Sequence, residues 1–357
     1  MDLFEVKDID RQIYEEELKD FLPDEIIDIH THIWLDELRQ LSKITPKKRT
    51  VSWPSLVAKE NSVEDLQETY RLMFPGKKVT PLMFTSGKRD VLPVLNNYVK
   101  ESAAKTGYPA LYYSCPEQSG EELEKQIRDG GFLGLKSYLS LSPGYLPTNE
   151  IRILDFFPKH QLRKINEMKG IIMLHIPRDG RLKDPVNLAQ IIEIKQQFPD
   201  IRLILAHIGR AYVQSDVGNA FEELSECTDL LFDFSANSCE YAMTKLLESV
   251  GTERIMFGSD LPILRMRTHR IEENNTYINL IPPGLYGDPS QDKHLRETSE
   301  EAAKITFFMY EEILAFKKVA IKLGLTKEDI NKVFYQNAKN LIDSTRNNLY
   351  GVGGCYV

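Results

Sequence analysis

The chain has 357 residues, of which 42% are hydrophobic and 27% are charged, and it carries a formal net charge of −8 at pH 7. This composition is ordinary for a globular protein with ample apolar material for a full core. The acidic balance, without clustered lysine and arginine, argues against a nucleic-acid partner. No stretch approaches the roughly 18 to 20 apolar residues of a membrane span.

The N-terminal segment "MDLFEVKDIDRQIYEEELKD" is too charged for a secretory signal peptide. The four cysteines are scattered and form no CxxC pair, so we expect reduced thiols. These features predict a cytoplasmic protein without a membrane partner.

Eight short apolar runs recur along the chain, separated by amphipathic stretches. Most runs are continuous rather than alternating, which is the pattern of parallel strands buried on both faces. In chain order the predicted strands occupy residues 25–30, 78–85, 109–115, 131–140, 170–176, 201–208, 230–236 and 254–260.

Helix signals lie between the predicted strands. Capping boxes, in which a serine or threonine precedes an acidic residue by three, begin at Ser62, Ser119 and Thr326. Segments 184–200 and 237–251 carry broad apolar stripes. Two further helices are expected near the end of the chain, at about 300–323 and 326–344.

Strands that alternate with helices predict a parallel α/β fold. Eight such strands fit a closed (β/α)8 TIM barrel better than an open doubly wound sheet. The predicted barrel domain spans 25–345, between an N-terminal extension at 1–24 and a C-terminal tail at 346–357. A barrel needs about 250 residues, so the surplus is assigned to the N-terminal extension and to loop insertions after strands 1 and 8, at 34–60 and 261–298. The second loop is long enough to be a lid over a site or a dimer contact, and a homo-oligomer is left open.

Histidine and aspartate residues follow several predicted strands directly. His30 and His32 end strand 1, His175 ends strand 5, His207 ends strand 6 and Asp260 ends strand 8. Side chains i and i+2 of a strand share a face, so His30 and His32 leave it together, about 7 Å apart. The carboxyl ends of barrel strands meet at one mouth, where active sites are built.

His30 and His32 alone could be two loop histidines bonded to the backbone, and His175 or His207 alone could be a hydrogen-bonded core residue, but the joint placement predicts a metal site. Zinc and similar divalent ions take histidine nitrogen and carboxylate oxygen as ligands, and catalytic sites keep one position for water. A bound ion lowers the pKa of that water from about 15.7 to about 7, and a nearby carboxylate can then act as general base.

The ordered set His30-x-His32, His175, His207 and Asp260 resembles the amidohydrolase superfamily of metal-dependent barrels. It is similar in particular to the amidohydrolase-related branch that includes aminocarboxymuconate-semialdehyde decarboxylase. The resemblance runs from about residue 25 to 343 and includes "GFLGLK", "FGSDLP" and "VFYQNAKNLI". It implies that His30, His32, His175 and Asp260 bind one divalent ion, with zinc expected. It also implies that His207 is a catalytic imidazole and Asp260 a proton acceptor.

Three cationic residues are candidates for substrate binding. Lys136 lies close to the position where other branches of the superfamily carry a carboxylated lysine that bridges two metals. In those branches the strand-6 histidine is also a metal ligand. The alternative is that Lys136 is an unmodified cation that lines the pocket. Arg178 and Arg210 each follow a site histidine by three residues, and a guanidinium fork suits a carboxylate. A salt bridge between neighbouring loops is the alternative for both. Together they predict a small carboxylate-bearing substrate.

Three functions are compatible with this pattern. The first is a metal-dependent hydrolase that adds activated water to an amide, ester or lactone. The second is a metal-dependent non-oxidative decarboxylase, a lyase, that uses the same residues. The third is a catalytically idle barrel that serves as a scaffold, which the retention of all five candidate residues disfavours.

Overall fold

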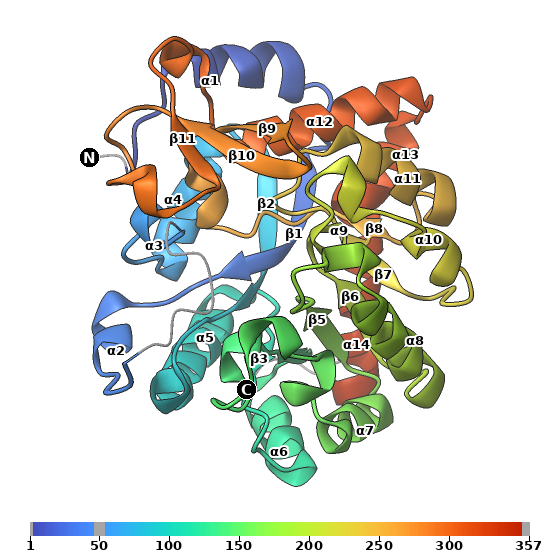
Figure 1. Cartoon of the computed structure of the whole chain (residues 1–357). Helices are drawn as coiled ribbons and strands as arrows, with labels where there is room; N and C mark the ends of the chain where they lie inside the picture. The colour runs from blue at the N-terminus through green and yellow to red at the C-terminus, as the bar shows by residue number, and fades with distance from the viewer. Residues whose placement is uncertain (1–2, 46–53, 352–357) are drawn as a thin grey trace.

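The structure, a computed structural model, describes residues 3–45 and 54–351 (Figure 1). Every one of the eight predicted apolar runs contains a strand. The parallel strands are β1 (Glu25–His32), β2 (Lys78–Phe84), β3 (Tyr112–Tyr113), β4 (Gly134–Lys136), β5 (Ile171–Leu174), β6 (Arg202–Leu205), β7 (Leu231–Asp233) and β8 (Ile255–Met256).

These strands form two parallel sheets. Strand β1 pairs with β2, and strands β3 to β8 pair in chain order in a six-stranded sheet. Isolated parallel bridges connect the sheets, between Met83 and Ala110 and between Thr31 and Leu261. The predicted parallel α/β fold is therefore confirmed.

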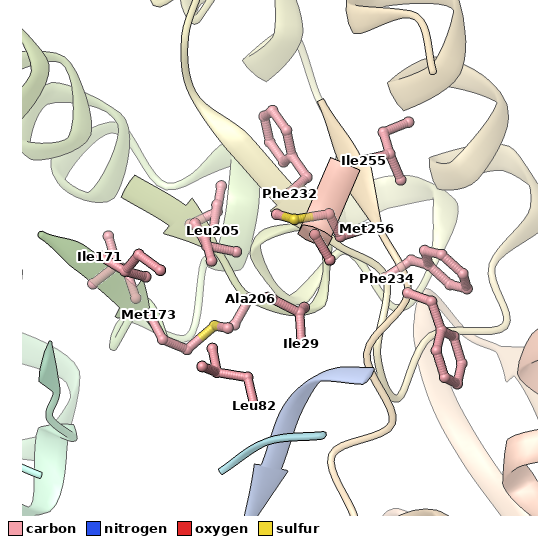
Figure 2. Close-up of a cluster of buried hydrophobic side chains, with 14 of the residues drawn as sticks. Ile29, Leu82, Ile171, Met173, Leu205, Ala206, Phe232, Phe234, Ile255 and Met256 are labelled. Atoms are coloured by element: carbon pink, nitrogen blue, oxygen red, sulfur yellow. The ribbon is translucent and has the colours of Figure 1, made fainter. Parts of the chain in front are cut away.

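The strands are buried along most of their length and form the hydrophobic core, as their apolar sequences predicted. The side chains come from β1, β2 and β5 to β8, and from the residues that follow β6 and β7 (Figure 2). The residues labelled in that view are Ile29, Leu82, Ile171, Met173, Leu205, Ala206, Phe232, Phe234, Ile255 and Met256.

Helices surround the strands, and α5 to α8 cover the outer side of β3 to β6 in Figure 1. All three predicted capping boxes are present, since Ser62, Ser119 and Thr326 each accept a hydrogen bond from the backbone three residues on. The helices are α1 (Asp8–Ile13), α2 (Asp36–Gln40), α3 (Pro54–Val57), α4 (Val63–Met73), α5 (Leu92–Thr106), α6 (Gly120–Gly130), α7 (Lys159–Met168), α8 (Pro185–Gln197), α9 (His207–Arg210), α10 (Ala220–Glu223), α11 (Glu240–Val250), α12 (Phe308–Lys322), α13 (Lys327–Asn331) and α14 (Asn337–Tyr350).

The segment after β8, expected as a loop, contains a small sheet of its own. Strand β10 (Thr276–Ile281) pairs antiparallel with β9 (His269–Glu273) and parallel with β11 (Leu295–Glu297). The turn between β9 and β10 has two residues, Asn274 and Asn275, with φ of 51° and 58°. Positive φ at both positions is the requirement of a type I′ hairpin turn.

Both terminal segments pack on the strands and helices. The first contributes Tyr14 and Leu18 to the main core, and the Tyr14 hydroxyl donates to the Pro75 carbonyl at 2.6 Å. Helix α14 continues to Tyr350, whose hydroxyl lies 2.7 Å from the Phe132 carbonyl and 2.8 Å from the Ile127 carbonyl in the last turn of α6. Within the predicted terminal segments and the first loop, residues 1–2, 46–53 and 352–357 lie outside the described residues. Across the described ranges, no helix is long and apolar enough to cross a bilayer.

Candidate metal centre

Three of the predicted site residues form a compact group at the carboxyl ends of the strands. His30 lies on β1, His207 follows β6, and Asp260 follows β8. Their ligand atoms all lie within 4.8 Å of one another, and all three side chains are buried. The Asp260 N–H donates to the His30 carbonyl at 2.8 Å, which ties the segment after β8 to β1. The donor set of two imidazoles and a carboxylate is one that a divalent ion can occupy.

The other two histidines border this group. His32 Nε2 lies 3.1 Å from Asp260 Oδ1, and the His175 ring centroid lies 5.3 Å from that of His207. The Nδ1 atoms of His32 and His175 are buried without a hydrogen-bond partner among the described residues. All five predicted residues thus lie together at one end of the strands, although which of them bind metal stays a prediction.

Asp233, at the end of β7, holds two of the histidines and was not among the predicted site residues. Its Oδ2 accepts a hydrogen bond from His30 Nδ1 at 2.9 Å, and its Oδ1 accepts from the His207 backbone N–H at 2.8 Å. A proton on His30 Nδ1 leaves the Nε2 lone pair facing Asp260 Oδ1, 3.5 Å away. Carboxylates play this role behind metal-binding histidines. The sequence signal was an aspartate inside the predicted strand "LLFDFSA".

The tautomer of His207 is fixed in a similar way. Its Nδ1 lies 2.8 Å from the Ser235 hydroxyl, which donates its own proton to Asp233, and 3.0 Å from the Ser235 carbonyl oxygen, which can only accept, so the proton resides on Nδ1. Burial lowers the pKa of His207 to about 4, and the ring is neutral at pH 7. His207 therefore presents a lone pair on Nε2, which can bind a metal or accept a proton.

Asp260 is an ionised carboxylate at neutral pH. Burial acts to raise the pKa of its carboxyl, but the hydrogen bond with His32 and the nearby imidazoles outweigh burial and lower the pKa to about 2. Behind it, Asp28 on β1 accepts hydrogen bonds from the Ser259 N–H and the Tyr70 hydroxyl, both at 2.8 Å. Burial raises the pKa of Asp28 to about 7. These contacts hold the chain at Asp260 against β1.

Lys136 ends β4 and its side chain is buried. Burial lowers the pKa of its amine to about 8, against the opposing charges of Asp260 and Asp233. The lysine charge in turn contributes to the lowered pKa of all four site histidines. Lys136 thus lies beside the candidate centre, and an amine with this pKa is compatible with both a pocket cation and a carboxylated lysine.

The two arginines predicted to bind substrate have partners within the loops. Arg178 Nε pairs with Asp184, which caps α8, at 3.0 Å. Arg210 Nη1 donates to the carbonyls of Ile176, Pro177 and Arg178 at 3.3, 3.1 and 3.1 Å. Both side chains stabilise the loop after β5, and a role in substrate binding stays a prediction for each.

Three tyrosines line the same end of the strands, and sequence analysis missed them. The Tyr138 ring lies 4.7 Å from His175, and the Tyr212 ring lies 6.5 Å from His207. Tyr277, on β10, lies 5.2 Å from Tyr212, so the sheet formed after β8 (orange in Figure 1) contacts a tyrosine that borders the candidate centre. Arg270 stacks over Tyr212 and Tyr277 at 4.9 and 4.5 Å.

Comparison with protein families gives one match, to the amidohydrolase family, over residues 27–343. No curated protein matches the chain significantly.

Solved structures with the same fold include enzymes of several activities. A 4-oxalomesaconate hydratase from Rhodopseudomonas palustris is 17% identical, with a TM-score of 0.56 over 89% of this chain and 95% of that one. A dihydroxybenzoic acid decarboxylase from Polaromonas sp. JS666 with bound manganese is 15% identical, with a TM-score of 0.52 over 92% and 100%. An amidohydrolase from Burkholderia multivorans with bound zinc is 12% identical, with a TM-score of 0.57 over 89% and 99%.

Proposed function

This chain belongs to the amidohydrolase family, and on that premise we propose that it is a metal-dependent hydrolase of a small carboxylate-bearing amide, ester or lactone. The observation that carries the proposal is the meeting of two expected ligands, His30 and Asp260, with the His207 imidazole, since the nitrogen and oxygen atoms of all three lie within 4.8 Å of one another. Hydrogen bonds to Asp233 and Ser235 fix both imidazoles in the tautomer that presents an Nε2 lone pair to the group.

The family and the fold support two finer parts of this proposal. We infer that the eight parallel strands form a closed barrel, because the bridges Met83–Ala110 and Thr31–Leu261 connect both strands of the β1–β2 sheet to the chain around β3 and β8. We also infer that one divalent ion binds at the centre, with zinc expected. Two of the solved structures of this fold carry manganese or zinc.

The residues of this chain have distinct parts in such a reaction. A bound divalent ion would lower the pKa of a water to about 7 and polarise the carbonyl that the water attacks. The ionised Asp260 accepts the proton of the attacking water. The His207 Nε2 lone pair accepts that proton in turn and delivers it to the leaving nitrogen or oxygen as the C–N or C–O bond breaks. Lys136, Arg178 and Arg210 are the cations available to the substrate carboxylate.

Decarboxylation is the second candidate, and the tyrosines favour it. Tyr138, Tyr212 and Tyr277 form an aromatic border beside His175 and His207, which suits a flat aromatic acid. A decarboxylase of dihydroxybenzoic acid shares this fold. In this case the C–C bond to the carboxylate breaks, carbon dioxide leaves, and a proton from the site replaces it on the ring.

Metal analysis and product analysis test the proposal together. The purified protein is expected to hold one divalent ion per chain, and a panel of carboxylate-bearing lactones, amides and aromatic acids is then screened in ¹⁸O-labelled water. Incorporation of ¹⁸O into an acid product supports hydrolysis, whereas release of carbon dioxide without it supports decarboxylation. Failure to bind zinc or manganese after supplementation would refute both candidates.

Two variants test the roles of the histidines. His30→Asn is expected to lose metal and turnover together, because it removes a ligand. His207→Asn is expected to keep the ion but to lose on the order of 10²–10⁴ in kcat, the usual contribution of a positioned proton acceptor. If His207→Asn loses the ion as readily as His30→Asn, His207 is a ligand instead.

A further inference from the structure

The chain that carries His207 has an unusual backbone. Four consecutive residues, His207, Ile208, Gly209 and Arg210, have positive φ of 59°, 49°, 58° and 61°. The left-handed region is disfavoured for every L-residue and is visited mostly by single glycines rather than by a full turn. Ile208 is β-branched, for which such a φ is a genuine outlier. A left-handed turn of this kind persists only where its surroundings enforce it.

Two side chains, one at the end of β7 and one just after it, enforce this turn at both ends. At its start, Asp233 Oδ1 accepts the His207 N–H at 2.8 Å. At its end, Asn237 Nδ2 donates to the Ala211 carbonyl at 2.9 Å and reaches the His207 carbonyl at 3.4 Å. The same amide therefore spans the turn, from its first residue to the residue that follows it.

The amide orientation of Asn237 is determined by its partners. Its Oδ1 accepts the Cys239 N–H at 2.8 Å, and the two carbonyls on the other side require a donor. The side chain is fully buried, so water does not replace these bonds at low cost. Because the Asn237 amide bonds to the backbone carbonyls of His207 and Ala211, it acts on the His207 ring through the backbone of the turn.

We propose that Asn237 is a positioning residue, which locks the left-handed turn and thereby aims the His207 imidazole at His30 and Asp260. The proposal rests on the proposed function only in that His207 serves the metal centre. The structural part of the inference does not depend on that function. Without the Asn237 amide, the turn relaxes towards ordinary backbone angles. The bond from His207 Nδ1 to the Ser235 carbonyl, 3.0 Å long, is then weakened.

Asn337, which is half-buried, is a control for the loss of an asparagine amide that bridges two backbone carbonyls. Asn337 Nδ2 also donates to two carbonyls, those of Thr252 and Ile255, at 2.7 and 2.9 Å. These carbonyls precede or begin β8, whereas the candidate centre follows the strand ends. Asn337→Ala therefore also removes an amide that donates to two backbone carbonyls, but it leaves the His207 turn untouched.

The experiment compares Asn237→Ala and the isosteric Asn237→Asp with Asn337→Ala. Histidine ¹H–¹⁵N spectra report the His207 Nδ1–H signal, which is assigned by its absence in His207→Asn. The signal is expected to shift or exchange faster in both Asn237 variants and to stay unchanged in Asn337→Ala. With a substrate in hand, kcat is expected to fall on the order of 10- to 100-fold in the Asn237 variants, as for other outer partners of site histidines, with KM and melting temperature close to those of Asn337→Ala.

The outcomes separate this inference from the proposed function. An unchanged His207 signal in folded Asn237 variants would overturn the inference, whether or not the protein binds metal. Loss of folded protein in both Asn237 variants, but not in Asn337→Ala, would also overturn it, because Asn237 would then be a general structural residue. If the wild-type protein binds no metal while the Asn237 variants show the predicted spectral change, only the proposed function is refuted.

Discussion

The buried ion pair between Asp10 and Arg267 leads to a prediction about stability. Asp10, on α1, is fully buried. Its Oδ1 accepts from Arg267 Nη1 at 3.0 Å and from the Thr306 hydroxyl at 2.7 Å, while its Oδ2 accepts from the Lys7 N–H at 2.7 Å. One carboxylate thus joins the N-terminal segment, the chain before β9 and the chain before α12.

Asp10→Ala is expected to destabilise the protein by about 3–5 kcal/mol, the usual cost of removing one partner of a buried ion pair. The reason is the guanidinium that stays behind. The Arg267 side chain is only 7% exposed, and its remaining acceptors are the carbonyls of Glu5 at 2.9 Å and Ile305 at 3.4 Å. Two neutral carbonyls do not replace a carboxylate for a buried cation.

Asp8→Ala is the matched control, because Asp8 lies on the same helix. Its pair with Arg11, at 3.3 Å, is exposed on both sides, and such surface pairs contribute about 0–1 kcal/mol. The free energy of unfolding is measured by urea titration, followed by fluorescence and circular dichroism. A loss in Asp10→Ala no larger than that in Asp8→Ala would refute the reasoning.

Two further predictions concern other charged residues. Lys136→Ala is expected to leave one divalent ion bound per chain and mainly to raise KM, whereas loss of a second equivalent of metal, measured by elemental analysis, would establish a carboxylated, bridging lysine. At the surface, the hydrogen bond with Glu311, 2.9 Å long, raises the pKa of His269. The stabilisation that this bond gives the folded state is therefore complete below the unfolded pKa of about 6.5. It is lost as the pH rises through the higher pKa of the folded state. The difference in melting temperature between the wild type and His269→Gln should shrink from pH 6 to pH 9, and a constant difference would contradict this assignment.

The parallel strands and the polar residues at their ends could be predicted because their signals are local. A continuous apolar run such as 201–208 identifies a buried strand without reference to any partner. The direction of parallel strands then brings His30, His175, His207 and Asp260 to one end, whatever the details of the loops. The capping boxes at Ser62, Ser119 and Thr326 are local in the same sense, since each involves residues three apart.

Features that depend on distant partners were not predicted. The β9–β10 hairpin had a local signal in Asn274-Asn275, a pair suited to positive φ, but the strand before this pair, "HRIEE", is short and mostly polar. The burial of Asp10 could not be foreseen, because its partner Arg267 is 257 residues away in the sequence. Only the packing of α1 on the chain before β9 makes that carboxylate a core residue.

The same contrast applies within the candidate centre, and strand β7 illustrates it. A search for ligand residues at strand ends selects β1, β5, β6 and β8, and it passes over β7, which contributes no predicted ligand. Yet Asp233, Ser235 and Asn237 contact the His30 ring, the His207 ring and both ends of the His207 turn. These contacts depend on β7 lying between β6 and β8 in the sheet, an arrangement that no single stretch of sequence reveals. The residues that touch a metal are recognised by their type, whereas those that orient them are recognised by their place in the fold, and Asp233, Ser235 and Asn237 all lie at the end of β7 or just after it.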